Sequence, residues 1–267
     1  MSMKGTLSAL PTLMKVSFAE AVAYRAEMLI WVFSTTMPLI MLALWSAVAR
    51  DAPVGRFGQS QFIAYFLATF IVRQLTGSWA AWQLTMEIRQ GVLSMRLLRP
   101  IHPLWGYVTE NLAAVPLRVV VALPVAVIAL ASVGAGAFPH DPFIWGLWLL
   151  SMLGGWLVTF LANVCVGTLS FFIGSSLKVM DVYLACFMVF SGYLLPVELF
   201  PPFLQKALLW LPFRYQIGLS VELLTGAYGR MDGLAMLGHQ WTYVVALFAL
   251  MRHSWSRGIR RFEAFGG

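Results

Sequence analysis

Long stretches without a charged residue constrain this chain more than any other feature. Residues 28–49 provide 22 consecutive uncharged residues, and residues 142–177 provide 36. A helix rises about 1.5 Å per residue, so roughly 20 apolar residues cross the hydrocarbon of a bilayer. Only 11% of the 267 residues are charged, against about 25% in soluble domains. So few charges could not give a globule a polar surface. We therefore expect an all-α polytopic membrane protein.

About six transmembrane helices are expected, with short loops that leave no room for a soluble catalytic domain. Pro38 is a candidate kink in the first of them. The uncharged stretch at 142–177 is too long for one perpendicular span, so we expect an interfacial segment before the fourth. The expected spans are 28–49, 61–82, 113–133, 144–173, 182–195 and 233–251.

The basic residues indicate an orientation. With the N-terminus inside, the cytoplasmic segments hold eleven Lys and Arg residues and the outer segments hold five. This asymmetry satisfies the positive-inside rule, so both termini are expected in the cytoplasm. The net charge of +7 is then explained by loops that touch anionic lipid headgroups, and nucleic acid is not an expected partner.

Two terminal segments flank the spans. Met14, Phe18, Ala21 and Val22 can share one helix face ahead of the first span, which favours an interfacial amphipathic helix within residues 1–27. Residues 252–267 are basic and are expected to form a cytoplasmic tail.

Prolines cluster between the fifth and sixth spans, in residues 196–232. Proline breaks helices and is tolerated in a membrane where neighbouring helices satisfy the backbone. We expect a re-entrant hairpin on the outer side, and the alternative is an extramembrane loop packed on the protein. The prolines concerned are Pro196, Pro201, Pro202 and Pro212.

The loop at 84–108 between the second and third spans is the most informative segment. Its core, MEIRQGVLSMRLLRPIHP, predicts a short basic amphipathic helix that stops before Pro100. Val92, Met95 and Leu98 would line one side, while the arginines would project towards water or a partner. The alternative is a loop helix that only binds lipid headgroups.

Several motifs resemble one known family in the same order. Residues 88–93 (IRQGVL) and 97–100 (LLRP), followed by Pro103, are similar to a loop of type-2 permeases of the ATP-binding-cassette superfamily. The likeness is strongest to a branch of paired, uncharacterised bacterial permeases. The segments SGYLLP, LFP and LPF at 191–213 resemble the outer re-entrant region of that superfamily, and residues 257–266 (RGIRRFEAFG) resemble its C-terminal signature.

The resemblance implies a partner and a role for the loop. In such permeases the loop forms a coupling helix that inserts into a groove of a separate nucleotide-binding ATPase subunit, which holds ATP and Mg²⁺. The implied contacts in this chain are Glu87, Arg89, Gly91, Arg96 and Arg99. Charged groups on a rigid helix can transmit motion to the spans that the helix joins.

The same resemblance implies the assembly and its location. Two permease subunits, identical or related, enclose a path formed largely by their first, second and fifth spans in the bacterial inner membrane. The expected activity is export of a lipophilic or amphipathic cargo. Candidate path residues are Arg73, Trp45, Tyr65, Phe66, Phe187 and Phe190.

Two arginines are expected inside spans, where an unpaired charge is expensive. Arg73 lies midway along the second span and is a candidate for the path. Arg118 lies near the cytoplasmic end of the third span, where it can snorkel or pair with Glu110.

Missing motifs weigh against other function classes. The sequence contains no G-x-x-x-x-G-K-[ST] and no H-E-x-x-H, so we expect no enzyme activity, cofactor or metal in this chain. The alternative is a stand-alone channel or secondary carrier, against which stands the lack of inverted repeats and of paired carboxylates inside the spans. An intramembrane enzyme would need polar dyads that are missing.

Overall fold

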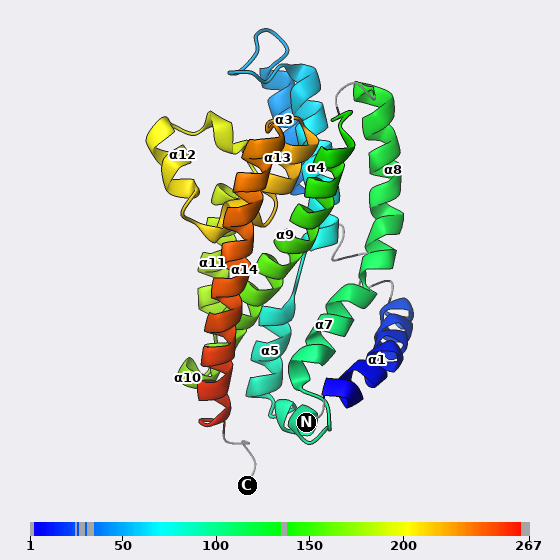
Figure 1. Cartoon of the computed structure of the whole chain (residues 1–267), viewed down its shortest axis with the longest axis vertical. Helices are drawn as coiled ribbons and strands as arrows, with labels where there is room; N and C mark the ends of the chain where they lie inside the picture. The colour runs from blue at the N-terminus through cyan, green and yellow to red at the C-terminus, as the bar shows by residue number, and fades with distance from the viewer. Residues whose placement is uncertain (1–2, 25, 27–29, 31–34, 135–137, 263–267) are drawn as a thin grey trace.

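The chain folds as an all-α bundle (Figure 1). The computed structural model describes residues 3–24, 26, 30, 35–134 and 138–262, and these residues contain no β-strand. The elements in chain order are α1 (Met3–Ala23), α3 (Met37–Val48), α4 (Gln59–Thr76), α5 (Ala80–Arg89), α6 (Leu93–Leu97), α7 (Pro103–Ala113), α8 (Val115–Val133), α9 (Pro142–Thr168), α10 (Ser170–Ile173), α11 (Leu177–Phe190), η2 (Val197–Leu199), α12 (Pro202–Leu208), η3 (Pro212–Tyr215), α13 (Gly218–Leu224) and α14 (Arg230–Ile259).

Among the described residues, three helical stretches are long and apolar enough to cross a membrane. They are Pro103–Ser132, Pro142–Ile173 and Arg230–Ile259, and they match the third, fourth and sixth expected spans. The expected class, an all-α polytopic membrane protein, is confirmed. Two boundaries were wrong: the third span begins about ten residues before Ala113, and α14 continues eight residues past Met251.

The start of α7 explains the earlier boundary of the third span. His102 is the N-cap residue, and its Nδ1 accepts a hydrogen bond from the backbone N–H of Leu104 at 3.3 Å. Burial lowers the pKa of His102, which favours the neutral ring that this bond needs. Pro103 follows at the first helical position, where its missing N–H costs nothing.

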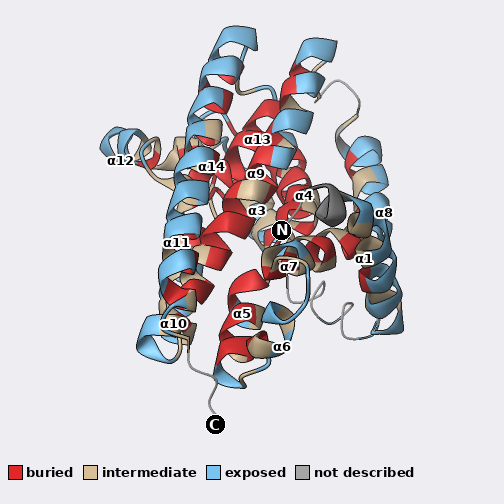
Figure 2. Cartoon of the chain, turned by 60° about the horizontal axis from the view of Figure 1, so that its bottom comes forward, coloured by how far each residue is buried: buried red, intermediate tan, exposed pale blue. Residues whose placement is uncertain are grey.

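The first helix of the fourth span, α9, runs through the core of the bundle (Figure 2). It begins directly at Pro142, because the Asp141 side chain accepts from the Phe143 N–H at 3.0 Å. The Arg230 guanidinium, and after it this bond, lower the pKa of Asp141. The prediction of an interfacial segment before the fourth span is therefore wrong, because the uncharged stretch is helical from Pro142 to Ile173 apart from one residue.

The second span is broken rather than continuous. The helix expected over 61–82 stops at Thr76, and α5 starts at Ala80. Arg118 of α8 lies at this break, where its Nη1 donates to the carbonyl oxygens of Gln74 at 3.3 Å and Gly77 at 2.9 Å. A cation at the carbonyl end of a helix satisfies acceptors that have no partner within the helix.

α11 is as long as the fifth expected span but lies five residues earlier in the chain, and the first expected span is described only in part. α3 covers Met37–Val48 with Pro38 in its first turn, so Pro38 starts this helix instead of kinking it. Residues 28, 29 and 31–34 of the expected first span lie outside the described residues. α11 begins at Leu177 and ends at Phe190, and Gly192 follows with φ +85°, a conformation that glycine adopts readily.

Prolines open the short helices of residues 196–232, which are expected on the outer side and are therefore called the outer segment. Pro196 precedes η2, Pro201 precedes α12, and Pro202 and Pro212 occupy the first positions of α12 and η3. The chain then enters the bundle as α13, in which every residue is buried. The segment therefore folds as short helices that turn back into the bundle, and its depth in the membrane stays a prediction.

The N-terminal helix differs in extent from the expected one. α1 runs over Met3–Ala23 with Pro11 inside it, and it packs on α7, where Ser17 Oγ lies 3.4 Å from Thr109 Oγ1. Phe18 is exposed and does not share the packed face. Residues 27 and 263–267, the ends of the two expected terminal segments, lie outside the described residues.

Glycines of α9 allow close helix contact. A Cβ on Gly155 would lie 2.8 Å from the backbone oxygen of Gln216, and a Cβ on Gly154 would meet the side chain of Gln240. Gly146 of the same helix has no such neighbour within 4 Å. Small residues let helix backbones approach in membranes, and here they admit the segment that leads into α13.

The Gly155→Ala substitution is predicted to lower stability, because the new methyl group would push against backbone rather than a flexible side chain. The expected loss is about 1–3 kcal/mol, measured by thermal unfolding of the purified protein in detergent. Gly146→Ala is the matched control in the same helix and should leave stability unchanged or raise it. Equal stabilities of the two variants would contradict the close contact.

Candidate functional site

The loop between α5 and α7 begins with a turn at Gly91. Gly91 has φ +72° and lets the chain leave α5, and Ser94 Oγ donates to the Gly91 carbonyl at 2.6 Å. α6 then forms over five residues and stops before Pro100. The expected stop is confirmed, but the expected helix was too long, because residues 86–89 belong to α5.

One arginine ties this loop to the helices on both sides. Arg96 of α6 lies 2.8 Å from Glu87 of α5 and 2.9 Å from Glu110 of α7. Its guanidinium also lies 4.8 Å from the ring of Tyr107. The Tyr107 hydroxyl donates to Glu87 at 2.6 Å, and Gln83 donates to Glu110. We call these five residues the Arg96 cluster.

The Arg96 cluster is largely shielded from solvent. The side chains of Arg96, Glu87 and Glu110 are 17%, 11% and 21% exposed. Although burial opposes its charge, the two carboxylates raise the pKa of Arg96 above its ordinary value. A charge-assisted pair shielded in this way is stronger than a surface pair.

This geometry corrects the sequence prediction for the loop. The side chains of Arg96 and Glu87 point inward and hold α6 in place. The expectation that Arg96 projects towards water is therefore wrong. Among the implied contact residues, Arg89 and Arg99 are exposed and Gly91 forms the turn. The apolar side is also exposed, with Val92 at 45%, Met95 at 64% and Leu98 at 81%. These five exposed residues, Arg89, Val92, Met95, Leu98 and Arg99, are called the loop surface.

The two arginines inside spans lie close to each other. Arg118 lies with its guanidinium 4.7 Å from the Trp79 ring, and Arg73 lies 4.9 Å from the Phe187 ring. The Nη1 atoms of both are 3.4 Å from the point that a Cβ on Gly77 would occupy. The expected Arg118–Glu110 pair is wrong, because Glu110 binds Arg96 and Arg118 binds carbonyl oxygens.

Most of the aromatic path candidates lie in the packed core. Tyr65 is 1% exposed and donates to the Gly192 carbonyl at 2.8 Å, and Phe66 is fully buried. Trp45 donates to the Leu194 carbonyl at 3.1 Å, and the Phe190 ring lies 6.4 Å from that of Phe213. Only Phe187 among these aromatic residues lines a cavity together with Arg73.

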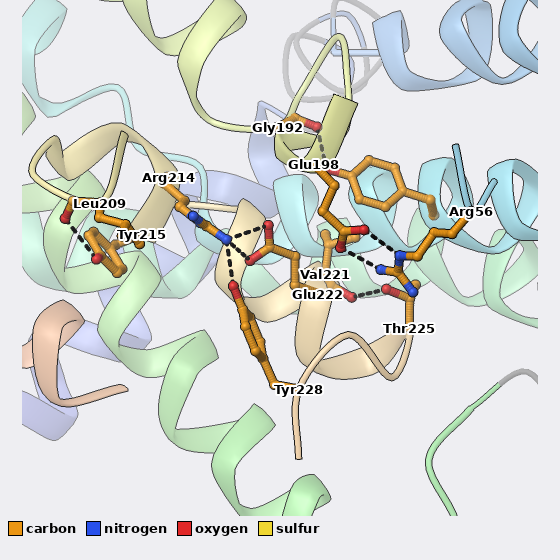
Figure 3. Close-up of polar contacts among 11 residues, drawn as sticks. Arg56, Gly192, Glu198, Leu209, Arg214, Tyr215, Val221, Glu222, Thr225 and Tyr228 are labelled. Atoms are coloured by element: carbon orange, nitrogen blue, oxygen red, sulfur yellow. Dashed lines mark hydrogen bonds and ion pairs between the residues drawn. The ribbon is translucent and has the colours of Figure 1, made fainter. Parts of the chain in front are cut away.

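A second polar cluster lies at the opposite end of the bundle (Figure 3). Arg214 Nη2 binds both carboxylate oxygens of Glu222 at 3.1 Å and also the Tyr228 hydroxyl. Arg56, in the loop after α3, pairs with Glu198 of η2. Arg56, Glu198, Arg214 and Tyr228 border an open cavity of about 620 Å³. One pair joins η3 to α13 and the other joins the 50–58 loop to η2, so both help to hold the outer segment on the bundle.

Several partners in these two clusters were not predicted from the sequence. Tyr107, Glu222 and Tyr228 received no role there, and Glu110 was paired with Arg118, although each of the four contacts Arg96 or Arg214 in the structure. A weak signal was available: inside a mostly apolar chain, a carboxylate next to a span needs a cation. No group of three or more His, Cys, Asp or Glu residues that could bind a metal occurs in the described part of the chain.

A family model described as ABC-2 family transporter protein matches residues 37–266. The chain belongs to this family. The resemblance found in the sequence is thereby confirmed, and it extends from α3 through the tail. No curated protein matches the chain.

Membership in the ABC-2 family supports a membrane-embedded permease role for the chain and implies association with an ATP-binding subunit. In a permease of this family, the loop surface is the natural candidate for that contact. It is exposed, and the Arg96 cluster links it directly to α5 and α7.

Removing Arg96 is predicted to destabilise the loop strongly. In Arg96→Gln, two shielded carboxylates would face each other without their cation, and breaking such a pair typically costs about 3–5 kcal/mol. Thermal unfolding and trypsin cleavage near residues 89–99 should both reveal the loss. Arg99→Gln, three residues away and exposed, should change neither, and similar behaviour of both variants would contradict the assigned role of Arg96.

The outer cluster gives a parallel prediction. Arg214→Met leaves Glu222, which is 2% exposed, without its partner, so a loss of about 3–5 kcal/mol in unfolding free energy is expected. Arg230→Met removes the exposed pair with Asp141 and should have little effect. If Arg230→Met proved the more destabilising variant in urea or thermal unfolding, the buried pair would not anchor the outer segment.

Proposed function

We propose that this chain is the permease subunit of an exporter driven by ATP hydrolysis in a separate nucleotide-binding subunit. The observation that carries the proposal is the loop surface held rigidly by Arg96 between α5 and α7. ABC-2 membership supports the same role. The partner would hold ATP and Mg²⁺, while this chain would supply the membrane path.

The geometry suggests how motion would be transmitted. A docked ATPase subunit would contact Arg89, Arg99 and the apolar residues between them. Because Arg96 joins α6 to both neighbouring helices, displacement of α6 would move α5 and α7 together instead of bending the loop. A rigid element that joins two helices is a simple device for such coupling.

The assembly we infer contains two permease subunits in the bacterial inner membrane, with both termini in the cytoplasm. The excess of Lys and Arg on the side of the loop surface supports this orientation. The predominantly apolar spans favour a lipophilic or amphipathic cargo, moved outward.

Purification from native cells tests the proposal directly. The tagged chain should co-purify in mild detergent with a nucleotide-binding subunit, identified by mass spectrometry, and the complex should hydrolyse ATP. A stable assembly of this chain alone, with transport that follows an ion gradient instead of ATP, would contradict the proposal and favour a channel or carrier.

Substitutions on the loop surface should separate docking from folding. Met95→Asp and the double variant Arg89→Glu/Arg99→Glu are predicted to reduce ATPase recovery at least tenfold, because they place the wrong polarity or charge in the contact. Arg252→Glu, exposed on α14, is the control and should bind normally. Full ATPase recovery with Met95→Asp would remove the loop surface as the docking site.

A further inference from the structure

A small cavity lies beside Arg73, between α4, α9 and α11. Its lining includes Ser78, Asn163, Tyr183 and Gln216, together with Phe187. The enclosed volume is about 10 Å³, which is room for about one water molecule. The cavity is therefore small, with a positive charge and several polar side chains in a lining that also contains Met180 and Leu184.

The charge of Arg73 has no counter-ion among the described residues. Within the described part of the chain, no carboxylate lies within 4.0 Å of its guanidinium, whereas Arg96, Arg214 and Arg56 each have at least one. Arg118 adds a second positive charge nearby and also has no acidic partner among the residues that the structure describes. A cation inside a span is expensive unless it is paired or serves a function, so this site favours an anion from outside the chain.

Two polar side chains at the cavity have unused hydrogen-bonding capacity. Gln216 is fully buried, and its Oε1 accepts from Tyr183 at 2.9 Å while its Nε2 has no partner. Asn163 is 2% exposed, and its Oδ1 has no partner. Buried polar atoms are almost always satisfied. Arg73, Gln216 and the Ser78 hydroxyl thus offer donors to an anion, and Asn163 offers an acceptor to a hydroxyl group beside it.

α11 forms one wall of the cavity. Its outward side is apolar, and little of its surface is buried against the bundle. Phe187 is its one buried residue, whereas Val182, Leu184 and Val189 are 65%, 37% and 41% exposed. A helix with so little buried surface can move with little loss of packing. Its movement would widen the cavity and place an acyl chain along its apolar side.

We propose that the Arg73 cavity binds the anionic headgroup, a phosphate or carboxylate, of the amphipathic cargo. This inference rests on the proposed transport function and specifies its substrate class. Arg73 supplies the charge, Gln216 and Ser78 supply further donors, and the hydrocarbon part of the cargo lies against α11.

Direct binding to the full chain, purified in neutral detergent with the subunits that co-purify, tests the proposal. The probes are radiolabelled lysophosphatidic acid and the monoacylglycerol with the same acyl chain, which differ only in the phosphate. The wild-type chain should bind the phosphate-bearing probe saturably and at least tenfold more tightly. Arg73→Gln should abolish this preference, Arg73→Lys should retain part of it, and Arg252→Gln should behave as wild type.

The outcomes are separable from those of the function test, because binding is measured without ATP hydrolysis or transport. Arg73→Gln leaves no acidic partner unpaired, so its unfolding temperature should not fall. Equal binding of the two probes by the wild-type chain would overturn the proposal whether or not the variants fold. Displacement of lysophosphatidic acid by inorganic phosphate at equal concentrations would overturn the assignment to an amphiphile and indicate a site for free anions.

Discussion

The contact of Arg96 with Glu87 and Glu110 is the interaction on which the functional account depends. It joins α5, α6 and α7, which follow one another in the sequence, and it holds the five-residue helix α6 in a fixed position. Without it, Val92, Met95 and Leu98 would lie on a flexible loop, and a partner could displace them without moving the spans. Shielding from water makes the pair strong, and it also makes loss of one member costly.

Polar groups elsewhere in the bundle also need partners within the protein, because lipid offers none to charged side chains or to backbone N–H and C=O groups. Arg118 binds the carbonyl groups left free where α4 ends, and Arg214 is neutralised by Glu222. Arg73 differs, since its surroundings are hydroxyl, amide and aromatic groups. That difference separates arginines that hold the fold together from one that is available to a ligand.

Features that depend on hydropathy could be predicted from the sequence, whereas features that depend on contacts between distant residues could not. The long helices at 142–173 and 230–259 follow directly from apolar length, and the family was recognisable from the loop and proline motifs. The break at 77–79 was not predictable from local pattern, because Gly and Ser are common in membrane helices and the residue that stabilises the break, Arg118, is 41 positions away. The inward orientation of the Arg96 side chain was also not predictable, because five helical residues show too little periodicity to distinguish an inward from an outward face.

We expect α6 to move with α5 and α7 as one body when nucleotide binds to the partner. Spin labels at exposed positions outside the loop surface measure this directly, with the free cysteines Cys165 and Cys186 replaced. One pair at Leu97 and Trp82 spans α6 and α5, and another at Leu97 and Val182 spans α6 and α11. In the complex with the ATPase subunit, ATP should leave the first distance unchanged and shift the second. A nucleotide-dependent change in the Leu97–Trp82 distance would contradict the coupled motion.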